Sequence, residues 1–247
     1  EMVENVLLKQ VPLENILVEP QAKNTAPCIL YAALVLMKNF GDGIMCVFPS
    51  DHYITDENRF RVILEKAIQA ANDSGKIVTV GIKPTFPSTG YGYIYHRPNP
   101  EPNNESYEVL EFIEKPNFET AKKFLESGNY LWNSGMFVWK TSVIIENFKR
   151  FLPRIYERMQ DYYQQMNEDN GNNILDEVYS ALPNISIDFG ILERSTEVTV
   201  IPGDFGWSDI GSWDALGAVF PPDENGNIIK ADHIGINTKD SVIYGNG

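Results

Sequence analysis

Two aspartates, Asp51 and Asp209, are the side chains best suited to holding a metal ion. Asp51 follows the continuous apolar run 44–48, and Asp209 lies in the turn 206–213, which reads Gly-Trp-Ser-Asp-Ile-Gly-Ser-Trp. A carboxylate at the end of a buried strand can bind a hard cation through oxygen, and Mg²⁺ prefers such ligands. Either aspartate alone is more simply explained as a turn-forming or helix-capping residue. The pair therefore raises a metal site as a hypothesis that other motifs must support.

A glycine-rich stretch has the chemistry of sugar recognition. Residues 89–93 read Thr-Gly-Tyr-Gly-Tyr, which places Gly90 and Gly92 around Tyr91. Two glycines allow the backbone amides to approach a sugar closely while the rings pack beneath it. The same stretch could be only a tight turn that leads into a strand.

The next polar pair is Glu114 and Lys115, which come after an expected strand and before Pro116. A carboxylate accepts hydrogen bonds from sugar hydroxyls, and an ammonium group neutralises a phosphate as a point charge. As a bare dipeptide the pair could equally be a solvated ion pair.

Other polar residues have a structural and a functional interpretation. Asn133, before Ser134 and Gly135, carries a donor and an acceptor suited to hydroxyl recognition, but a buried structural asparagine is nearly as good an explanation. Asn24 and Thr25 stand at the start of an expected helix, where free amides favour polar ligands and an Asn can also cap. For His52 we expect a hydrogen-bonded structural histidine.

The elements that must position these residues begin with a β-α-β unit. The run 44–48 is apolar throughout, which predicts a central strand buried on both faces. N-cap residues at 55–57 and apolar residues at helical spacing predict a helix that ends at Gly75. The run 77–82 predicts a second strand, parallel to the first. Because ligands of such sheets bind at the carboxyl ends of the strands, residues 49–52 are well placed for function.

The rest of the chain alternates helices and strands. We expect helices over 25–41, 117–125, 141–151 and 154–165, and strands over 107–114 and 136–139. Residues 97–106 form a polar excursion. From residue 221 the composition shifts to Asn, Gly and short β stretches such as 234–236, which predicts a linker and the start of a small C-terminal β unit.

Composition limits the classes of protein. With 43% hydrophobic residues the chain can form a core, and its apolar runs are far shorter than the roughly 20 residues of a membrane span. The net charge of −14 disfavours nucleic acid. Cys28 and Cys46 lack CxxC spacing, and three histidines cannot assemble a zinc set. With no secretory signal in the sequence, we expect a cytoplasmic protein that binds neither nucleic acid nor a membrane.

Taken together, the motifs closely resemble the bacterial mannose-1-phosphate guanylyltransferases, the GDP-mannose pyrophosphorylases of the sugar nucleotidyltransferase superfamily. The similarity runs from about Val18 to Leu216 in the family's order. The stretches 127–137 and 206–213 are specific to the guanylyltransferase branch. The segments that carry the resemblance are 19–27, 49–52, 89–94, 114–116, 133–135 and 206–213.

The resemblance implies a role for each candidate residue. Asp51 and Asp209 would bind the catalytic Mg²⁺, the one expected cofactor, and Lys115 would assist catalysis near the sugar phosphate. Glu114 would bind the hexose. The expected substrate-binding residues are Asn24, Thr25, Gly90, Tyr91, Gly92, Glu114, Lys115 and Asn133. The family's Gly-Arg before Asn-Thr is replaced here by Ala22-Lys23, which puts an arginine contact to the nucleotide base in doubt.

The implied fold is an α/β, Rossmann-like, mostly parallel mixed sheet of the nucleotidyltransferase (GT-A-like) type. We expect a nucleotidyltransferase domain over 1–220 and a linker with the start of a β unit over 221–247. The family's glycine-rich nucleotide loop is not found in this sequence, so we expect the domain to be truncated at its N-terminus and its activity to depend on that loop.

The implied reaction joins GTP and mannose 1-phosphate to give GDP-mannose and pyrophosphate. One alternative is a nucleotidyltransferase for another sugar 1-phosphate or base, since hexose epimers differ by one hydroxyl. A second is a noncatalytic sugar-nucleotide-binding regulatory subunit. A homo-oligomer, and an isomerase domain after residue 247, are compatible with the resemblance.

Overall fold

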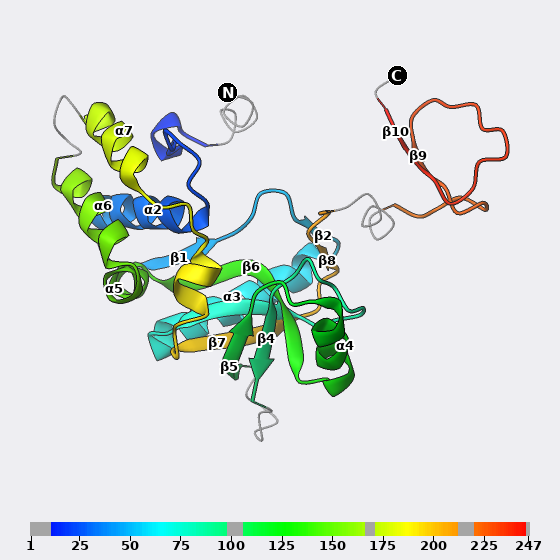
Figure 1. Ribbon diagram of the computed structural model, residues 1–247, viewed down its shortest axis with the longest axis horizontal. Coiled ribbons are helices and arrows are strands. Elements are labelled where there is room, and N and C mark those ends of the chain that lie inside the picture. The colour runs from blue at the N-terminus through cyan, green and yellow to red at the C-terminus, as the bar shows by residue number, and fades with distance from the viewer. Residues whose placement is uncertain (1–10, 98–105, 166–170, 212–219, 246–247) are drawn as a thin grey trace.

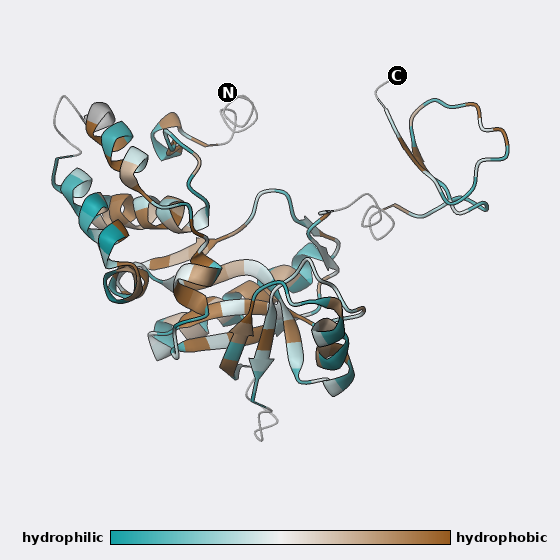
Figure 2. Ribbon diagram, viewed as in Figure 1, coloured by the Kyte–Doolittle hydropathy of each residue, from teal (hydrophilic) through white to brown (hydrophobic). Residues whose placement is uncertain are grey.

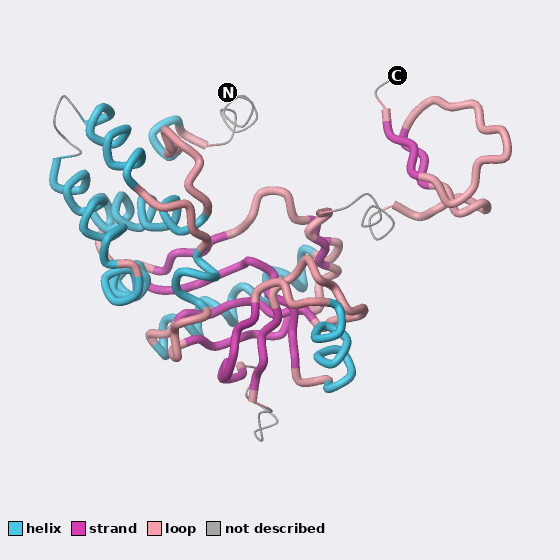
Figure 3. The backbone as a smooth tube through the Cα atoms, in the orientation of Figure 1, coloured by secondary structure: helices cyan, strands magenta, loops and turns pink. Residues whose placement is uncertain are grey.

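The computed structural model describes residues 11–97, 106–165, 171–211 and 220–245, with the side chains of 171–173 left out. Helices stand on both sides of a central sheet (Figures 1 and 3). The α-helices are α2 (Thr25–Phe40), α3 (Glu57–Ser74), α4 (Phe118–Ser127), α5 (Thr141–Phe151), α6 (Pro153–Gln165) and α7 (Gly171–Ala181). A 3₁₀ turn, η1 (Leu13–Asn15), precedes them, and a π-helical turn, η2 (Asp188–Leu192), follows α7.

Six strands form the central sheet in the order β1-β6-β3-β7-β5-β4. They are β1 (Ile44–Val47), β3 (Ile77–Ile82), β4 (Tyr93–His96), β5 (Tyr107–Ile113), β6 (Tyr130–Lys140) and β7 (Val198–Gly203). A separate two-residue pair joins β2 (Tyr53–Ile54) to β8 (Trp207–Ser208). Because β6 also pairs with β4, the strands β6, β3, β7, β5 and β4 close into a circuit of hydrogen-bonded neighbours.

The α/β class and the mixed sheet are confirmed, but the expectation of a mostly parallel sheet is wrong, because most described strand pairs are antiparallel. β6 lies between β1 and β3 and runs antiparallel to both. Of the strand pairs described in this sheet, β3 with β7 is the parallel one. β1 and β3 do point the same way, because each opposes β6, so the crossover through α3 skips one strand position.

The expectation of a central β1 is also wrong. β1 is at one end of the described sheet, and of its four residues only Met45 is buried. Apolar character alone does not distinguish an end strand from a central one, because helices can cover both faces of either. β6 is longer than expected, so Asn133 lies within a strand instead of before one.

The expected helices form where the local signals place them. Asp56 caps α3 by accepting from the Arg59 amide, and Asn117 caps α4 by accepting from the Thr120 amide. Gly75 and Gly128 end these two helices in the left-handed conformation. The break between α5 and α6 falls before Pro153, as expected. Local chemistry was therefore sufficient to fix these boundaries.

The two faces of the sheet bury different residues. On one face α2, α5, α6 and α7 enclose the largest core, in which Trp139, Phe148 and Tyr179 are fully buried. On the other face α3 packs Ala67 and Ala71 against the strands. Figure 2 shows the apolar residues along α2 and the strands, with hydrophilic residues on outer turns of α4 and α6. No helix in the described ranges combines the length and apolar character that a bilayer crossing requires.

Residues 220–245 contain a parallel pair of short strands, β9 (Ile228–Lys230) and β10 (Val242–Tyr244). This region holds β structure, but not where the sequence predicted it. Residues 234–236 lie in the loop between the strands, with Ile234 and Ile236 strongly exposed. Most of the expected polar excursion at 97–106, and residues 212–219 with Ser212 and Trp213 of the 206–213 motif, lie outside the described residues.

Candidate functional site

A cleft of about 400 Å³ opens where α2, the ends of β1 and β5, the middle of β6, and η2 meet. All of the expected substrate-binding residues except Asn24 line it together with Asp209, while Asp51 does not. The cleft is lined by Thr25, Cys28, Ile29, Val47, Phe48, Pro49, His52, Gly90, Tyr91, Gly92, Glu114, Lys115, Asn133, Ser134, Gly135, Phe137, Ile187, Asp188, Trp207 and Asp209. Segments far apart in sequence thus converge on one cavity.

Asp209 is held by two donors on one of its oxygens. The Tyr91 hydroxyl donates to Asp209 Oδ1 at 2.7 Å, and the Gly211 amide donates to the same oxygen at 3.1 Å. Burial, followed by this bond to Asp209, raises the pKa of Tyr91, so the phenol stays protonated and remains a donor. Among the described residues, both donors to this carboxylate use Oδ1 and none uses Oδ2.

His52 lies within the electrostatic influence of both aspartates. Its Nδ1 accepts a hydrogen bond from the Trp207 indole at 3.1 Å, as expected for a structural histidine. Burial lowers the pKa of His52, and the charges of Asp51 and Asp209 oppose that shift. Both carboxylates therefore act on the same imidazole, although Asp51 is exposed and Asp209 is half-buried.

The donor chemistry fits a divalent ion held jointly by protein and substrate. Among the described residues no group of three or more His, Cys, Asp and Glu side chains could hold a metal by itself. The Asp51 and Asp209 carboxylates supply hard oxygen donors near His52, and Mg²⁺ commonly takes one or two carboxylates plus substrate phosphates. The two residues fit that arrangement, in which phosphate completes the ligand set.

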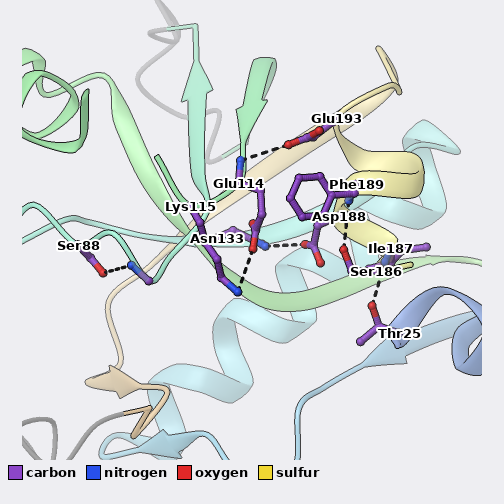
Figure 4. Close-up of polar contacts among 11 residues, drawn as sticks. Thr25, Ser88, Glu114, Lys115, Asn133, Ser186, Ile187, Asp188, Phe189 and Glu193 are labelled. Carbon is purple, nitrogen blue, oxygen red and sulfur yellow. Dashed lines mark hydrogen bonds and ion pairs between the residues drawn. The ribbon is translucent and has the colours of Figure 1, made fainter. Parts of the chain in front are cut away.

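Glu114 lies against the glycine stretch. A Cβ added to Gly92 would lie 2.5 Å from Glu114 Oε2, so only glycine leaves room for this carboxylate. The Lys115 ammonium stands 3.7 Å from Glu114 Oε1 and is itself largely exposed, at 62%. Lys115 has a positive φ of 47°, which turns its side chain at the end of β5. Figure 4 shows the contact between Glu114 and Lys115 next to the side chain of Asn133.

The surroundings of Glu114 disfavour the charged form of its carboxyl group. Burial raises its pKa to about 7, the charges of Asp188 and Glu193 add to the shift, and Lys115 opposes it. Its side chain is 12% exposed. A carboxyl group that titrates near neutral pH inside a cleft is a candidate for a functional role.

Asn133 lines the cleft and forms hydrogen bonds to other residues through both its side chain and its backbone. Its Nδ2 donates to Asp188 Oδ1 at 2.9 Å, and its Oδ1 accepts from the Thr79 hydroxyl and the Gly135 amide, each at 3.2 Å. The backbone N–H of Asn133 also donates to the Gly92 carbonyl, at 2.8 Å. The structural interpretation of Asn133 therefore holds, and any ligand contact adds to it.

Asn24 and Thr25 have structural partners. The Asn24 side chain accepts from the Thr25 amide at 2.9 Å and caps α2, as expected. The Thr25 hydroxyl accepts from the Ile187 amide at 2.9 Å (Figure 4). Thr25 thereby joins the start of α2 to the segment that leads into η2.

Asp188 and Glu193 are site residues that sequence reasoning missed. Burial raises the pKa of Asp188, and the hydrogen bond from Asn133 opposes that shift. The Glu193 carboxylate accepts from the Glu114 backbone amide at 3.3 Å. The sequence does contain one signal for Asp188: it is the lone acidic residue in the otherwise apolar stretch 187–192. Burial of a carboxylate without a partner costs free energy, so such a residue is expected to have one.

The nucleotidyl transferase family model matches residues 2–226, which is most of the chain. The chain belongs to the nucleotidyl transferase family. Membership of this family suggests use of a divalent metal ion, in agreement with the oxygen donors at Asp51 and Asp209. The α/β mixed sheet is therefore that of a nucleotidyl transferase.

Curated relatives of this nucleotidyl transferase include two bacterial proteins. The mannose-1-phosphate guanylyltransferase of Escherichia coli (strain K12) is 38% identical over 236 residues, 94% of this chain and 49% of the relative. The xanthan biosynthesis protein XanB of Xanthomonas campestris pv. campestris (strain B100) is 40% identical over 231 residues, 93% of this chain and 48% of the relative. The chain spans about half the length of these relatives.

Solved structures agree with the fold. The crystal structure of mannose-1-phosphate geranyltransferase from Thermus thermophilus superposes with a TM-score of 0.86 at 32% identity, and covers 99% of this chain and 69% of that one. Mannose-6-phosphate isomerase from Helicobacter pylori superposes with a TM-score of 0.64 at 29% identity, and covers 77% and 72% of the two chains.

Proposed function

We propose that this nucleotidyl transferase forms GDP-mannose and pyrophosphate from GTP and mannose 1-phosphate. One observation carries the proposal: the cleft brings the glycine stretch 90–92, Glu114, Lys115, Asn133 and Asp209 together. Relatives named for mannose-1-phosphate guanylyltransferase activity, 37–38% identical over more than nine tenths of this chain, support the choice of sugar and base.

The sugar phosphate would bind between the glycine stretch and the end of β5. The Glu114 carboxylate would accept hydrogen bonds from hexose hydroxyls, and the Gly90 and Gly92 backbone would lie against the ring. Lys115, whose ammonium is exposed beside Glu114, would neutralise the sugar phosphate. Asn133 would fix the floor of this subsite through its bonds to Thr79 and Asp188.

Catalysis would rest on positioning and charge neutralisation. A phosphate oxygen of the sugar would attack the α-phosphorus of GTP in line, pyrophosphate would leave, and no covalent intermediate with the protein would form. Mg²⁺, when bound, would stabilise the charge that develops on the phosphates. Asp51 and Asp209 would hold it, and Lys115 would assist. Asn24 and Thr25 would lie near the guanine base.

Several wider assignments belong to the same proposal. Residues 1–220 would form the nucleotidyltransferase domain, and 221–247 a linker with the start of a β unit, in agreement with the β9–β10 pair. The protein would act on small substrates in the cytoplasm and would form homo-oligomers.

A pyrophosphate-release assay on the complete gene product tests this function. A panel of sugar 1-phosphates and nucleoside triphosphates should show the fastest release with mannose 1-phosphate and GTP. The Asp209→Asn variant should lose about 10²-fold or more of that rate. Faster release with another sugar 1-phosphate and nucleoside triphosphate would mean that those are the substrates. Equal rates for the wild type and the variant would overturn the assigned site.

A further inference from the structure

Tyr91 and Asp209 are joined by the shortest side-chain contact among the expected site residues. The Tyr91 hydroxyl donates to Asp209 Oδ1 at 2.7 Å across 118 residues of sequence. Hydrogen bonds from a neutral hydroxyl to a carboxylate are short and roughly twice as strong as those between neutral groups. The bond ties the glycine stretch to the turn that carries Asp209.

The ring of Tyr91 is fixed by other aromatic rings. Its centroid lies 4.9 Å from that of Trp132, 5.3 Å from that of Trp207 and 6.3 Å from that of Phe86. The contacts with Trp132 and Trp207 are edge-on, the geometry that the ring quadrupoles favour. The hydroxyl is therefore presented to Asp209 by a ring whose orientation packing already determines.

The Asp209 turn is anchored a second time through Trp207. The Trp207 indole donates to His52 Nδ1 at 3.1 Å, and Trp207 pairs with Ile54 in the β2–β8 ladder. The turn is thus held at its backbone by β2 and at its carboxylate by Tyr91. Within the described residues, Tyr91 and Gly211 both donate to Oδ1, and no described donor uses Oδ2.

We propose that Tyr91 is a positioning residue for the divalent ion, acting through Asp209. Its hydroxyl fixes the rotamer of the Asp209 carboxylate so that Oδ2 faces the ion, and its backbone belongs to the stretch that receives the sugar. The carboxylate that holds the ion and the stretch that receives the sugar would therefore be fixed relative to each other. The inference rests on the proposed function, because it assumes that Asp209 holds the ion.

The substitution Tyr91→Phe isolates the hydroxyl, because it keeps the ring and its aromatic neighbours. Tyr95→Phe is the matched control: Tyr95 lies on the neighbouring strand β4, stacks on Tyr130, and its hydroxyl makes no hydrogen bond within the described residues. Asp209→Asn is the reference for loss of the ion ligand. Each variant is made in the complete gene product.

The direct measurement is a titration with Mn²⁺ in the presence of GDP-mannose, followed by electron paramagnetic resonance of the free ion. Loss of a residue that orients a metal ligand costs 10- to 100-fold in metal affinity, and the Gly211 amide still holds Oδ1, so we expect a weakening of about tenfold for Tyr91→Phe. Tyr95→Phe should bind Mn²⁺ as the wild type does.

Kinetics supply a second readout that a general loss of structure would not reproduce. Tyr91→Phe should raise the Mg²⁺ concentration for half-maximal rate by about tenfold. The KM for the sugar 1-phosphate should stay within about twofold, because the glycine backbone is unchanged.

The outcomes separate this inference from the proposed function. Wild-type Mn²⁺ affinity in Tyr91→Phe, with weak binding in Asp209→Asn, would overturn the role of Tyr91 and leave the function standing. Wild-type protein that binds Mn²⁺ no better than Asp209→Asn would overturn the ion site at Asp209 and the role of Tyr91, while the pyrophosphate-release assay tests the function separately. An increase confined to the KM for the sugar would show that the hydroxyl contacts substrate, and would also overturn the inference.

Discussion

Gly92 and Glu114 fit each other so closely that a methyl group added at position 92 would lie 2.5 Å from the Glu114 carboxylate. The same methyl would stand 3.4 Å from the Asn133 Cβ and from the Phe112 ring. Gly92 is buried, and its carbonyl accepts from the Asn133 amide, so its backbone cannot move aside without loss of that bond. Gly92 has no positive φ, so its backbone conformation does not call for a glycine. The reason for a glycine here is the space that its neighbours occupy.

The first prediction concerns this contact. Gly92→Ala should push the Glu114 carboxylate out of the sugar subsite and lower kcat/KM for the sugar phosphate by about 10²-fold, the scale of a misplacement of about 1 Å. Overpacking should also cost about 1–3 kcal/mol of unfolding free energy. The control is Gly43→Ala, where an added Cβ meets nothing within 4 Å. Steady-state kinetics with wild-type kcat/KM in Gly92→Ala would contradict the assigned subsite.

The second prediction concerns the pH dependence of stability. The folded protein holds the pKa of Glu114 near 7, above the ordinary value of 4.5, mainly because of burial. The folded state therefore binds a proton that the unfolded state releases, and the contribution of Glu114 is fully present below pH 4.5 and is lost as pH rises through about 7. At about 1.4 kcal/mol per pKa unit the loss is roughly 3 kcal/mol.

Urea unfolding over this pH range measures that loss. Glu114→Gln has no proton to release, so its unfolding free energy should fall less steeply with pH than that of the wild type. Glu111→Gln, at an exposed position of β5 just before Glu114, should keep the wild-type slope. Parallel curves for the wild type and Glu114→Gln would show that Glu114 titrates alike in the folded and unfolded states.

The third prediction concerns Thr25. Thr25→Val keeps the shape of the side chain but removes the acceptor for the Ile187 amide, and Ile187 is 1% exposed. An unsatisfied buried donor should lower the unfolding free energy by about 1–2 kcal/mol. Thr25→Ser retains the hydroxyl and should lose less than half of that amount. A Thr25→Val variant as stable as the wild type in denaturant unfolding would mean that this hydrogen bond does not contribute to stability.

Much of the fold could be predicted because its signals are local. The caps Asp56 and Asn117 and the stop residues Gly75 and Gly128 act within one helical turn, so the sequence around them determines the helix ends. Sheet order is different, because pairing joins residues far apart in the chain. Nothing near residues 44–48 indicates that 137–140 will pair with them and separate them from β3.

The site could be predicted in part for the same reason. Motifs at the ends of strands identified Glu114, Lys115 and Asp209, and these residues line the cleft. Asp188 belongs to a π-helical turn in an apolar stretch, and its role depends on Asn133, 55 residues away. The contact between Tyr91 and Asp209 likewise depends on tertiary packing that no spacing rule gives.

Under the proposed function, Asp51 and Asp209 hold one divalent ion beside a sugar nucleotide in this cleft. Crystals of the complete gene product soaked with GDP-mannose and Mn²⁺, and measured for anomalous scattering, test it most directly. We expect one anomalous peak in contact with both carboxylates, with the hexose against Glu114. A manganese peak or sugar nucleotide bound away from these residues would contradict it.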